Sequence, residues 1–197
     1  MITRVFALGI LATATAGLAH AQAYVRGGLT SSEADPYEPA VGYEIAAGYR
    51  FGAWRSELSV DSNPFDISLG NSTRFRGEDG AVTSAFASLY YDIPTQSFMT
   101  PYLGAGIGLS NIDAPLLNGE IDTHLGQNRF VVSGFNVTEV VWHGAVGVDF
   151  AFGPNFSLDA SLRYAAYPDK KYFYFTQGDN LTADSARQLR VSLRYRF

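Results

Sequence analysis

Histidine, carboxylate and hydroxyl side chains are the groups with which this chain could perform acid–base or nucleophilic chemistry. The chain has three histidines, His20, His124 and His143, and no cysteine. His20 falls in a segment that we expect to be removed (below). A hydrolase needs a nucleophile beside a histidine and a carboxylate. The sequences that begin at the other two histidines, "HLG" at His124 and "HGA" at His143, contain no nucleophile. We therefore predict no catalytic residue, no metal site and no cofactor.

A group of acidic residues is the other candidate for binding chemistry. Asp61, Asp66, Glu78 and Asp79 fall within an interval that we expect to be a loop, and their oxygens could hold calcium. Their spacing is not that of an EF-hand. A solvated acidic loop is the favoured interpretation.

Most other charged residues alternate with apolar ones, which is the period of a half-buried β-strand. In "VGYEIAAGYRF" (Val41–Phe51), Glu44 and Arg50 share one face, and Tyr43 and Ile45 lie on the other. The pattern recurs and predicts eight strands: Tyr24–Ser31, Val41–Phe51, Trp54–Val60, Ala81–Asp92, Pro101–Ser110, Val141–Phe150, Phe156–Tyr164 and Ser185–Phe197.

The connections between these strands alternate in length. Short links at "FGAW", "DIPTQSFMTP" and "FGPN" alternate with longer polar ones at about 31–40, 61–80, 111–139 and 165–184. Short turns at one rim and long loops at the other are typical of an up-and-down meander. We predict one all-β domain over residues 24–197, an eight-stranded antiparallel barrel.

The polar faces decide between a soluble barrel and a membrane barrel. A lipocalin-type barrel has an apolar interior and carries its charges outside. Here the apolar faces carry large side chains, whereas the other faces carry Gly, Ser and Ala with a few nearly balanced charges, which suits a narrow eight-stranded lumen. The predicted interior polar cluster is Glu44, Arg50, Arg55, Glu57, His143, Asp149, Asp159, Arg163, Arg190 and Arg194. Asp159 and Arg194 are expected to approach each other.

The N-terminal segment predicts export. Residues 1–23 have a basic start at Arg4, an uncharged run, and Ala-x-Ala sites that place cleavage after Ala21 or Ala23. Removing Arg4 from 14 basic residues leaves 13 against 19 acidic ones, a net charge near −6. An acidic chain without a basic patch is a poor nucleic-acid binder.

Aromatic residues flank the short turns. Tyr49, Phe51, Trp54, Tyr90, Tyr91, Phe150, Phe152, Phe156, Tyr195 and Phe197 would form an interfacial girdle at one rim. A second aromatic run, "KKYFYFTQGDN" (Lys170–Asn180), could contact a partner. Local packing among the loops is the favoured alternative.

The motifs "GYEIAAGYRF", "ASLYYDIP", "PYLGAGIGLS", "VWHGAVGVDFAF" and "LDASLRY" resemble the small eight-stranded outer-membrane barrels of Gram-negative bacteria. The most similar group is the opacity-protein-like porin family, and the membrane domain of OmpA shares the architecture. The resemblance implies a location in the outer membrane, contact with its lipid and lipopolysaccharide, and periplasmic termini. It also implies a C-terminal strand read by the outer-membrane assembly machinery, here Val191, Leu193, Tyr195 and Phe197.

The function that follows is a surface protein with a structural, adhesion or antigen role and no large pore, because an eight-stranded lumen is filled by side chains. A host or envelope partner could bind through the loops. Two alternatives stay open: a soluble periplasmic ligand-binding barrel, and an outer-membrane enzyme that modifies lipid A.

Overall fold

The computed structural model describes the backbone of residues 21–34, 37–65, 73–76, 80–114, 117–123, 126–132, 135–167, 173–174, 180–181 and 185–197, and most of the side chains of the barrel strands. Residues 1–20 of the predicted leader (residues 1–23) and His124, Asp66, Glu78 and Asp79 lie outside this part of the chain. Cleavage of residues 1–23 therefore stays a prediction. None of the described residues forms a helix long and apolar enough to span a membrane.

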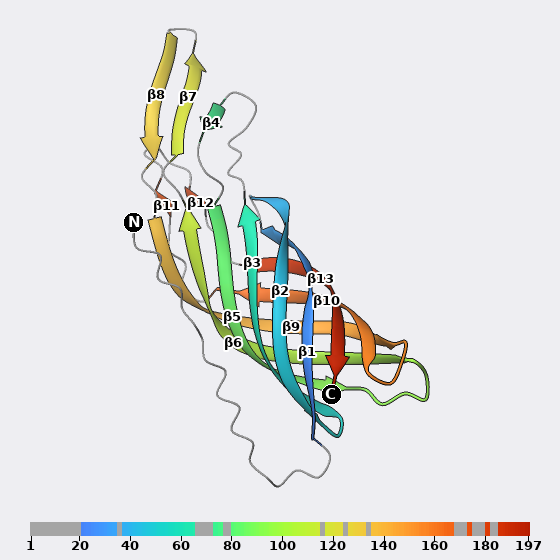
Figure 1. The fold of residues 1–197 in the computed structure, drawn as a ribbon. Helices are drawn as coiled ribbons and strands as arrows, with labels where there is room; N and C mark the ends of the chain where they lie inside the picture. The colour runs from blue at the N-terminus through green and yellow to red at the C-terminus, as the bar shows by residue number, and fades with distance from the viewer. Residues whose placement is uncertain are drawn as a thin grey trace.

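Eight strands close into one antiparallel barrel (Figure 1). They are β1 (Ala21–Ala34), β2 (Tyr37–Phe51), β3 (Trp54–Phe65), β5 (Gly80–Asp92), β6 (Met99–Ala114), β9 (Phe135–Ala151), β10 (Phe156–Ala166) and β13 (Ser185–Arg196). Their order around the barrel is β1-β13-β10-β9-β6-β5-β3-β2, so each strand pairs with its neighbours in the meander and the last strand closes on the first. The predicted architecture is confirmed.

Five further strands lie in segments that the sequence predicted to be loops. Strands β4 (Thr73–Arg76), β7 (Leu117–Thr123) and β8 (Gly126–Val132) form a three-stranded sheet in the order β4-β7-β8, and β11 (Phe173–Tyr174) pairs with β12 (Asn180–Leu181). The long polar loop predicted at 111–139 is thus wrong in its central part. Backbone pairing, which does not require an apolar face, continues from β6 and β9 into β7 and β8.

The strand registers fix the tilt of the barrel. Register pairs followed once around the barrel run from Glu33 through Arg187, Tyr164, Gly144, Ala105, Leu89, Ser56 and Tyr49 to Ala23. This circuit returns to β1 displaced by 33 − 23 = 10 residues. For eight strands, a shift of this size corresponds to a tilt of about 40° from the barrel axis.

The first short turn shows how the sequence ends a strand pair. Phe51 pairs with Trp54, which leaves Gly52 and Ala53 as a two-residue connection. Gly52 has a φ of 65°, the left-handed region that glycine occupies without steric cost. A positive φ at the first central position is typical of tight hairpins.

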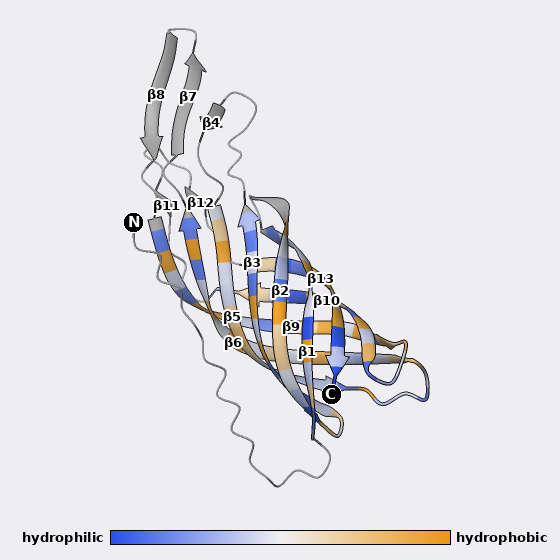
Figure 2. Ribbon diagram, viewed as in Figure 1, coloured by the Kyte–Doolittle hydropathy of each residue, from blue (hydrophilic) through white to orange (hydrophobic). Residues whose placement is uncertain are grey.

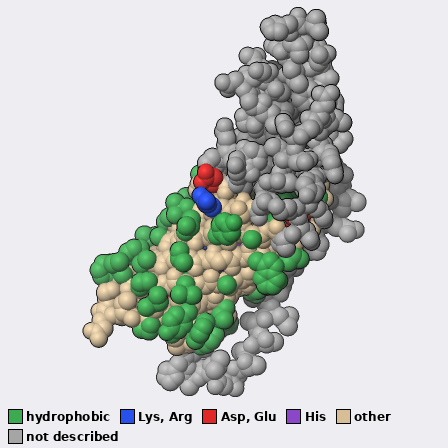
Figure 3. Space-filling model, turned by 180° about the vertical axis from the view of Figure 1, so that it is seen from behind, with side chains coloured by type: hydrophobic (Ala, Val, Ile, Leu, Met, Phe, Trp, Pro, Cys, Tyr) green, Lys and Arg blue, Asp and Glu red, His purple; other side chains and the backbone are tan. Residues whose placement is uncertain are grey.

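The outer surface of the barrel is apolar. Hydrophobic and hydrophilic residues alternate along the barrel strands (Figure 2), and Leu29, Ile45, Leu58, Leu103, Val146, Leu162 and Leu193 are among the exposed large side chains. Hydrophobic groups spread over the face shown in Figure 3, and the charged groups visible there lie at its margin. Because lipid requires an apolar exterior and a closed sheet, this surface suits a membrane.

The aromatic girdle predicted at the rim of the short turns, here called the lower girdle, is present with one correction. Tyr49, Trp54, Phe152 and Phe197 are exposed at the end of the barrel that carries the short turns. Tyr90, which the sequence placed in this girdle, is instead buried and lies against Tyr102 in the interior. It alternates with outward-facing Leu89, so its register places it inside the barrel.

Candidate functional site

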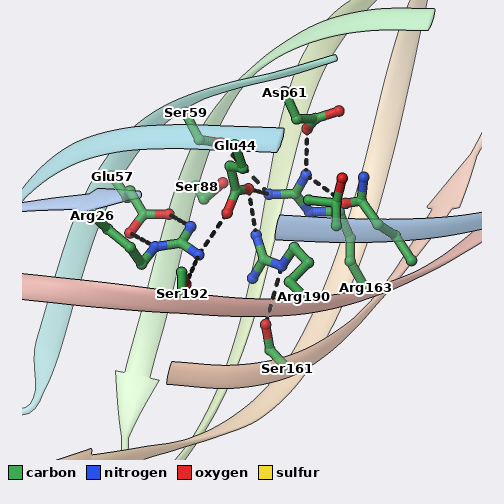
Figure 4. Close-up of polar contacts among 12 residues, drawn as sticks. Arg26, Glu44, Glu57, Ser59, Asp61, Ser88, Ser161, Arg163, Arg190 and Ser192 are labelled. Carbon is green, nitrogen blue, oxygen red and sulfur yellow. Dashed lines mark hydrogen bonds and ion pairs between the residues drawn. The ribbon is translucent and has the colours of Figure 1, made fainter. Parts of the chain in front are cut away.

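The centre of the barrel interior is organised around one carboxylate (Figure 4). Glu44, on β2, receives ion pairs from three arginines: Arg26 at 2.6 Å, Arg190 at 2.8 Å and Arg163 at 2.9 Å. These arginines come from β1, β13 and β10, so the hub joins four strands that follow one another around the barrel, β2-β1-β13-β10. All four side chains are almost completely buried.

Two further carboxylates belong to this central group. Glu57 binds Arg26 at 2.7 Å and accepts a hydrogen bond of 2.9 Å from the Tyr24 hydroxyl. Asp61 binds Arg163 at 2.8 Å. The prediction that Asp61 belongs to a polar loop is wrong, because β3 runs on to Phe65 and its inward alternation, from Glu57 through Ser59, includes Asp61.

A second group occupies the interior nearer the short turns. Arg194 bridges two carboxylates on neighbouring strands, Asp149 at 2.8 Å and Asp159 at 2.9 Å. The predicted approach of Asp159 and Arg194 is confirmed. Tyr102 donates a 2.9 Å hydrogen bond to Asp159, which gives this carboxylate a neutral donor as well as a cation.

Arg55 and Arg50 share the carboxylate of Asp92, which was not among the predicted interior residues. Arg55 binds Asp92 at 2.7 Å and lies 4.4 Å from the centroid of the Tyr102 ring. Arg50, predicted inside, is only partly buried: its side chain is 34% exposed and its Nε lies 3.4 Å from Asp92. Its neighbour Phe51 ends β2, so Arg50 is located at the rim, where its long side chain reaches solvent.

Most interior charges are paired. Ion pairs among the described residues connect six arginines to six carboxylates: Arg26, Arg50, Arg55, Arg163, Arg190 and Arg194, and Glu44, Glu57, Asp61, Asp92, Asp149 and Asp159. Pairing matters because an unpaired ion in a low-dielectric interior costs several kcal/mol. The pairs therefore hold the strands of the wall to one another across the lumen.

His143 lies in the same interior. Its Nε2 is 2.9 Å from the Ser88 hydroxyl, and its ring packs edge-on against Phe86. Its Nδ1 has no hydrogen-bond partner among the described residues, so no carboxylate completes a triad. Within the same part of the chain, no three His, Asp or Glu side chains are grouped to hold a metal.

Sequence reasoning missed Arg26, Asp61 and Asp92 as members of the charged interior. Arg26 falls in "YVRGGLTS", where two adjacent glycines hide the alternation. The signal was nevertheless present, because Tyr24, Arg26 and Thr30 are all buried and separated by even intervals. Asp92 ends β5 and is inward by the same count from Ser88 and Tyr90.

Glycines in the wall make room for rings from neighbouring strands. Five cross-strand pairs share this arrangement: Tyr24 with Gly48, Tyr90 with Gly104, His143 with Gly106, Phe86 with Gly108 and Tyr102 with Gly147. In each pair, a Cβ added to the glycine would collide with the facing ring. The glycine-rich faces noted in the sequence therefore hold aromatic side chains from adjacent strands.

A closed barrel with an apolar exterior and a charged, paired interior is the inverse of a soluble protein, and the sequence comparison agrees with it. The family model described as the outer membrane protein beta-barrel domain matches residues 3–197. The chain belongs to this family. It is an outer-membrane β-barrel surface protein of Gram-negative type, which contradicts the soluble periplasmic barrel.

One curated relative and several solved barrels are similar to this outer-membrane barrel. Outer membrane protein PagN of Salmonella typhimurium is 26% identical over 133 residues, which cover 66% of this chain and 51% of PagN. The chain thus spans about half the length of this curated relative. Neisserial surface protein A is 25% identical with a TM-score of 0.51, covering 90% of this chain and 97% of that one.

Two other solved structures show the fold alone. OprG from Pseudomonas aeruginosa has a TM-score of 0.59 at 14% identity, covering 89% of this chain and 95% of OprG. Ail, the attachment invasion locus protein of Yersinia pestis, was solved with the heparin analogue sucrose octasulfate. It has a TM-score of 0.51 at 15% identity, covering 90% of this chain and 97% of Ail.

Proposed function

We propose that this outer-membrane barrel is a non-enzymatic scaffold without a large pore, which holds the β4-β7-β8 sheet away from the membrane for contact with another surface. The observation that carries the proposal is the continuation of the β6–β9 pair into β7 and β8. The β7 strand alone, Leu117–Thr123, is roughly 20 Å long and pairs with β8 along its whole length. Figure 1 shows this sheet beyond one end of the barrel.

The interior supports the scaffold role. An eight-stranded barrel encloses only enough room for side chains, and here that room holds ion pairs and aromatic rings. Such cross-links favour a rigid base for the outer sheet over a channel.

The non-enzymatic part of the proposal is supported by His143. A lipid A-modifying enzyme must present its nucleophile and base to a lipid outside the barrel. The Ser88–His143 pair is instead buried inside, with no carboxylate on Nδ1 among the described residues. Neisserial surface protein A and the attachment invasion locus protein bear names that fit a surface role, and the proposal extends that role to this chain.

Shortening the outer sheet tests the proposal. In bacteria displaying the barrel, residues 115–134 are replaced by an Asn-Gly turn, which connects β6 to β9 directly. We expect binding to cultured epithelial cells and to matrix-coated plates to fall several-fold. Gel mobility with and without boiling should still report a folded barrel, because the eight barrel strands are unchanged.

A replacement of the same kind at 168–184, between β10 and β13, serves as the matched control and should reduce binding less. Unchanged binding after removal of 115–134 would contradict the role of the sheet. The lipid A mass spectrum should be the same with and without expression. A new lipid A species that disappears in His143→Ala or His124→Ala would replace the scaffold with an enzyme.

We further propose that the C-terminal strand is the segment read by the assembly machinery, with Val191, Leu193, Tyr195 and Phe197 as its signal. Val191, Leu193 and Phe197 are exposed on the outer face, and Tyr195 packs edge-on against Phe197. Phe197 donates its backbone N–H to Ala23 at 3.0 Å, at the seam where β13 meets β1. A signal on this seam would be accessible until the barrel closes.

Phe197→Ala is expected to lower the amount of folded barrel in the outer membrane several-fold, while the purified variant refolds in detergent like the parent. Phe152→Ala is a matched control, because Phe152 is 62% exposed and Phe197 is 67% exposed at the same rim. The readout is the heat-modifiable band in isolated outer membranes. Equal losses in the two variants would refute a specific role for the terminal residue.

A further inference from the structure

The outer face of the barrel carries very few charges. Among the described residues, the exposed charged side chains are Glu33, Asp113 and Arg187, and Arg187 alone of these is basic. Arg187 forms no hydrogen bond or ion pair with the residues that the structure describes. It follows the exposed apolar residues Leu193, Val191 and Leu189 along the same outward row of β13.

The position of Arg187 along the barrel axis follows from the tilt that the strand registers give. Ten residues separate it from Phe197 along β13, and a strand tilted by about 40° rises roughly 2.5 Å per residue along the barrel axis. Arg187 therefore lies roughly 25 Å above the lower girdle, which equals the usual height of the apolar band of such barrels.

Strands on other parts of the wall also change from apolar to polar residues near the same end of the barrel. The apolar row ends at Ser62 after Val60 on β3 and at Asn111 after Leu109 on β6. The hydroxyls of Ser62 and Thr83 lie 3.3 Å apart, and the Asn111 amide donates to Thr138 at 2.9 Å, so side-chain hydrogen bonds connect β3 to β5 and β6 to β9 at this level. Arg187 thus lies at the interface on the side of the long connections.

The immediate neighbours of Arg187 are one aromatic residue and one acidic residue. Tyr164 on β10 is the cross-strand neighbour of Arg187 and is half exposed, as expected of an aromatic residue at an interface. Glu33 is the neighbour on β1. A guanidinium is costly at the midplane of the lipid but not at the interface, where its planar fork matches phosphate.

We infer that Arg187 and Tyr164 form a binding site for a phosphate of lipid A in the outer leaflet. The inference rests on the orientation in the proposed function, with the long connections facing outward. Lipid A is the source because its phosphates lie at the interface of that leaflet, next to the upper end of the apolar surface. The site lies on the barrel wall and requires nothing of the β4-β7-β8 sheet.

The test is a titration of the purified, folded barrel in neutral detergent, followed by native mass spectrometry. The probes are bisphosphorylated lipid A, dephosphorylated lipid A and phosphatidylglycerol. Arg187→Gln is expected to weaken binding of bisphosphorylated lipid A by about tenfold, as for loss of a charge-assisted hydrogen bond. Glu33→Gln should keep or strengthen binding, because it removes a neighbouring negative charge.

Binding of dephosphorylated lipid A should be weak and unaffected by Arg187→Gln. The temperature at which the heat-modifiable band converts should be the same for both variants and the parent without lipid, since neither residue belongs to the interior network. Equal affinity of parent and Arg187→Gln would overturn the inference. An equal Arg187-dependent loss for phosphatidylglycerol would overturn lipid A as the ligand. Neither readout depends on adhesion, so this inference and the outer sheet's role in adhesion can fail independently.

Discussion

Glu44→Ala should lower the free energy of unfolding by about 3–5 kcal/mol, as expected when one partner of a buried ion pair is removed. Three arginines converge on this carboxylate, and the carboxylates of the described residues that would still pair with two of them are Glu57, Asp61 and, at 3.8 Å from Arg26, Asp159. The measurement is urea unfolding of the refolded barrel in lipid vesicles. Tryptophan fluorescence can report it, because Trp54 and Trp142 are both exposed on the outer face.

Ser59→Ala is the control for Glu44. Ser59 is buried beside the same network, with its hydroxyl 3.5 Å from Arg163, but it carries no charge. Its loss should cost about 1 kcal/mol or less. Combining Glu44→Gln with Arg190→Gln should cost less than the sum of the single changes, because the pair removes one charge of each sign. Additive effects would show that Glu44 does not act through Arg190.

Gly147→Val is expected to have the second large effect, a strong loss of folded barrel. A Cβ at Gly147 would lie 2.6 Å from the Tyr102 ring and 2.6 Å from the Ser161 Cβ, so ring and wall would both have to move. Overpacking of this kind costs about 1–3 kcal/mol for a small addition and more for a branched one. The readout is the fraction of heat-modifiable protein after refolding at increasing urea.

Gly144 is the matched control on the same strand. A Cβ there meets nothing within 4 Å, and the position faces outward. Gly144→Val should therefore fold as the parent does, while Gly147→Ala should show an intermediate loss. If the two valine variants lose folded protein equally, β-strand glycine content and not the Tyr102 contact decides stability.

Much of the barrel could be predicted because alternation is a local property. Residues such as Tyr43, Glu44 and Ile45 are assigned to a face by neighbours one position away. Where the local signal is weak, prediction failed for identifiable reasons. Asp61 was placed in a loop because polar residues follow it. Tyr90 was placed outside because a tyrosine beside a turn suits either the girdle or the interior.

Partners of the charged residues could not be predicted, because they depend on distant strands. The atoms of Arg163 meet Glu44 and Asp61 across the lumen, and these contacts span more than one hundred residues of sequence. The ten-residue shear decides which inward positions share a level, and shear follows from all the registers together. The β4-β7-β8 sheet was not predicted, because strands can pair through backbone hydrogen bonds without the alternation of apolar and polar residues by which strands are recognised in a sequence.

The ring–glycine pairs bear on the cooperativity of unfolding. The inner face of β6 carries Gly104, Gly106 and Gly108, which are covered in turn by Tyr90 from β5, His143 from β9 and Phe86 from β5. A β5–β6 hairpin alone would leave the middle glycine without its ring, covered only by Ser88 and the β5 backbone, and a β6–β9 hairpin would leave the two outer glycines without their rings. Packing of the three strands is therefore completed only together, so the β5-β6-β9 wall should open as one unit and not strand by strand.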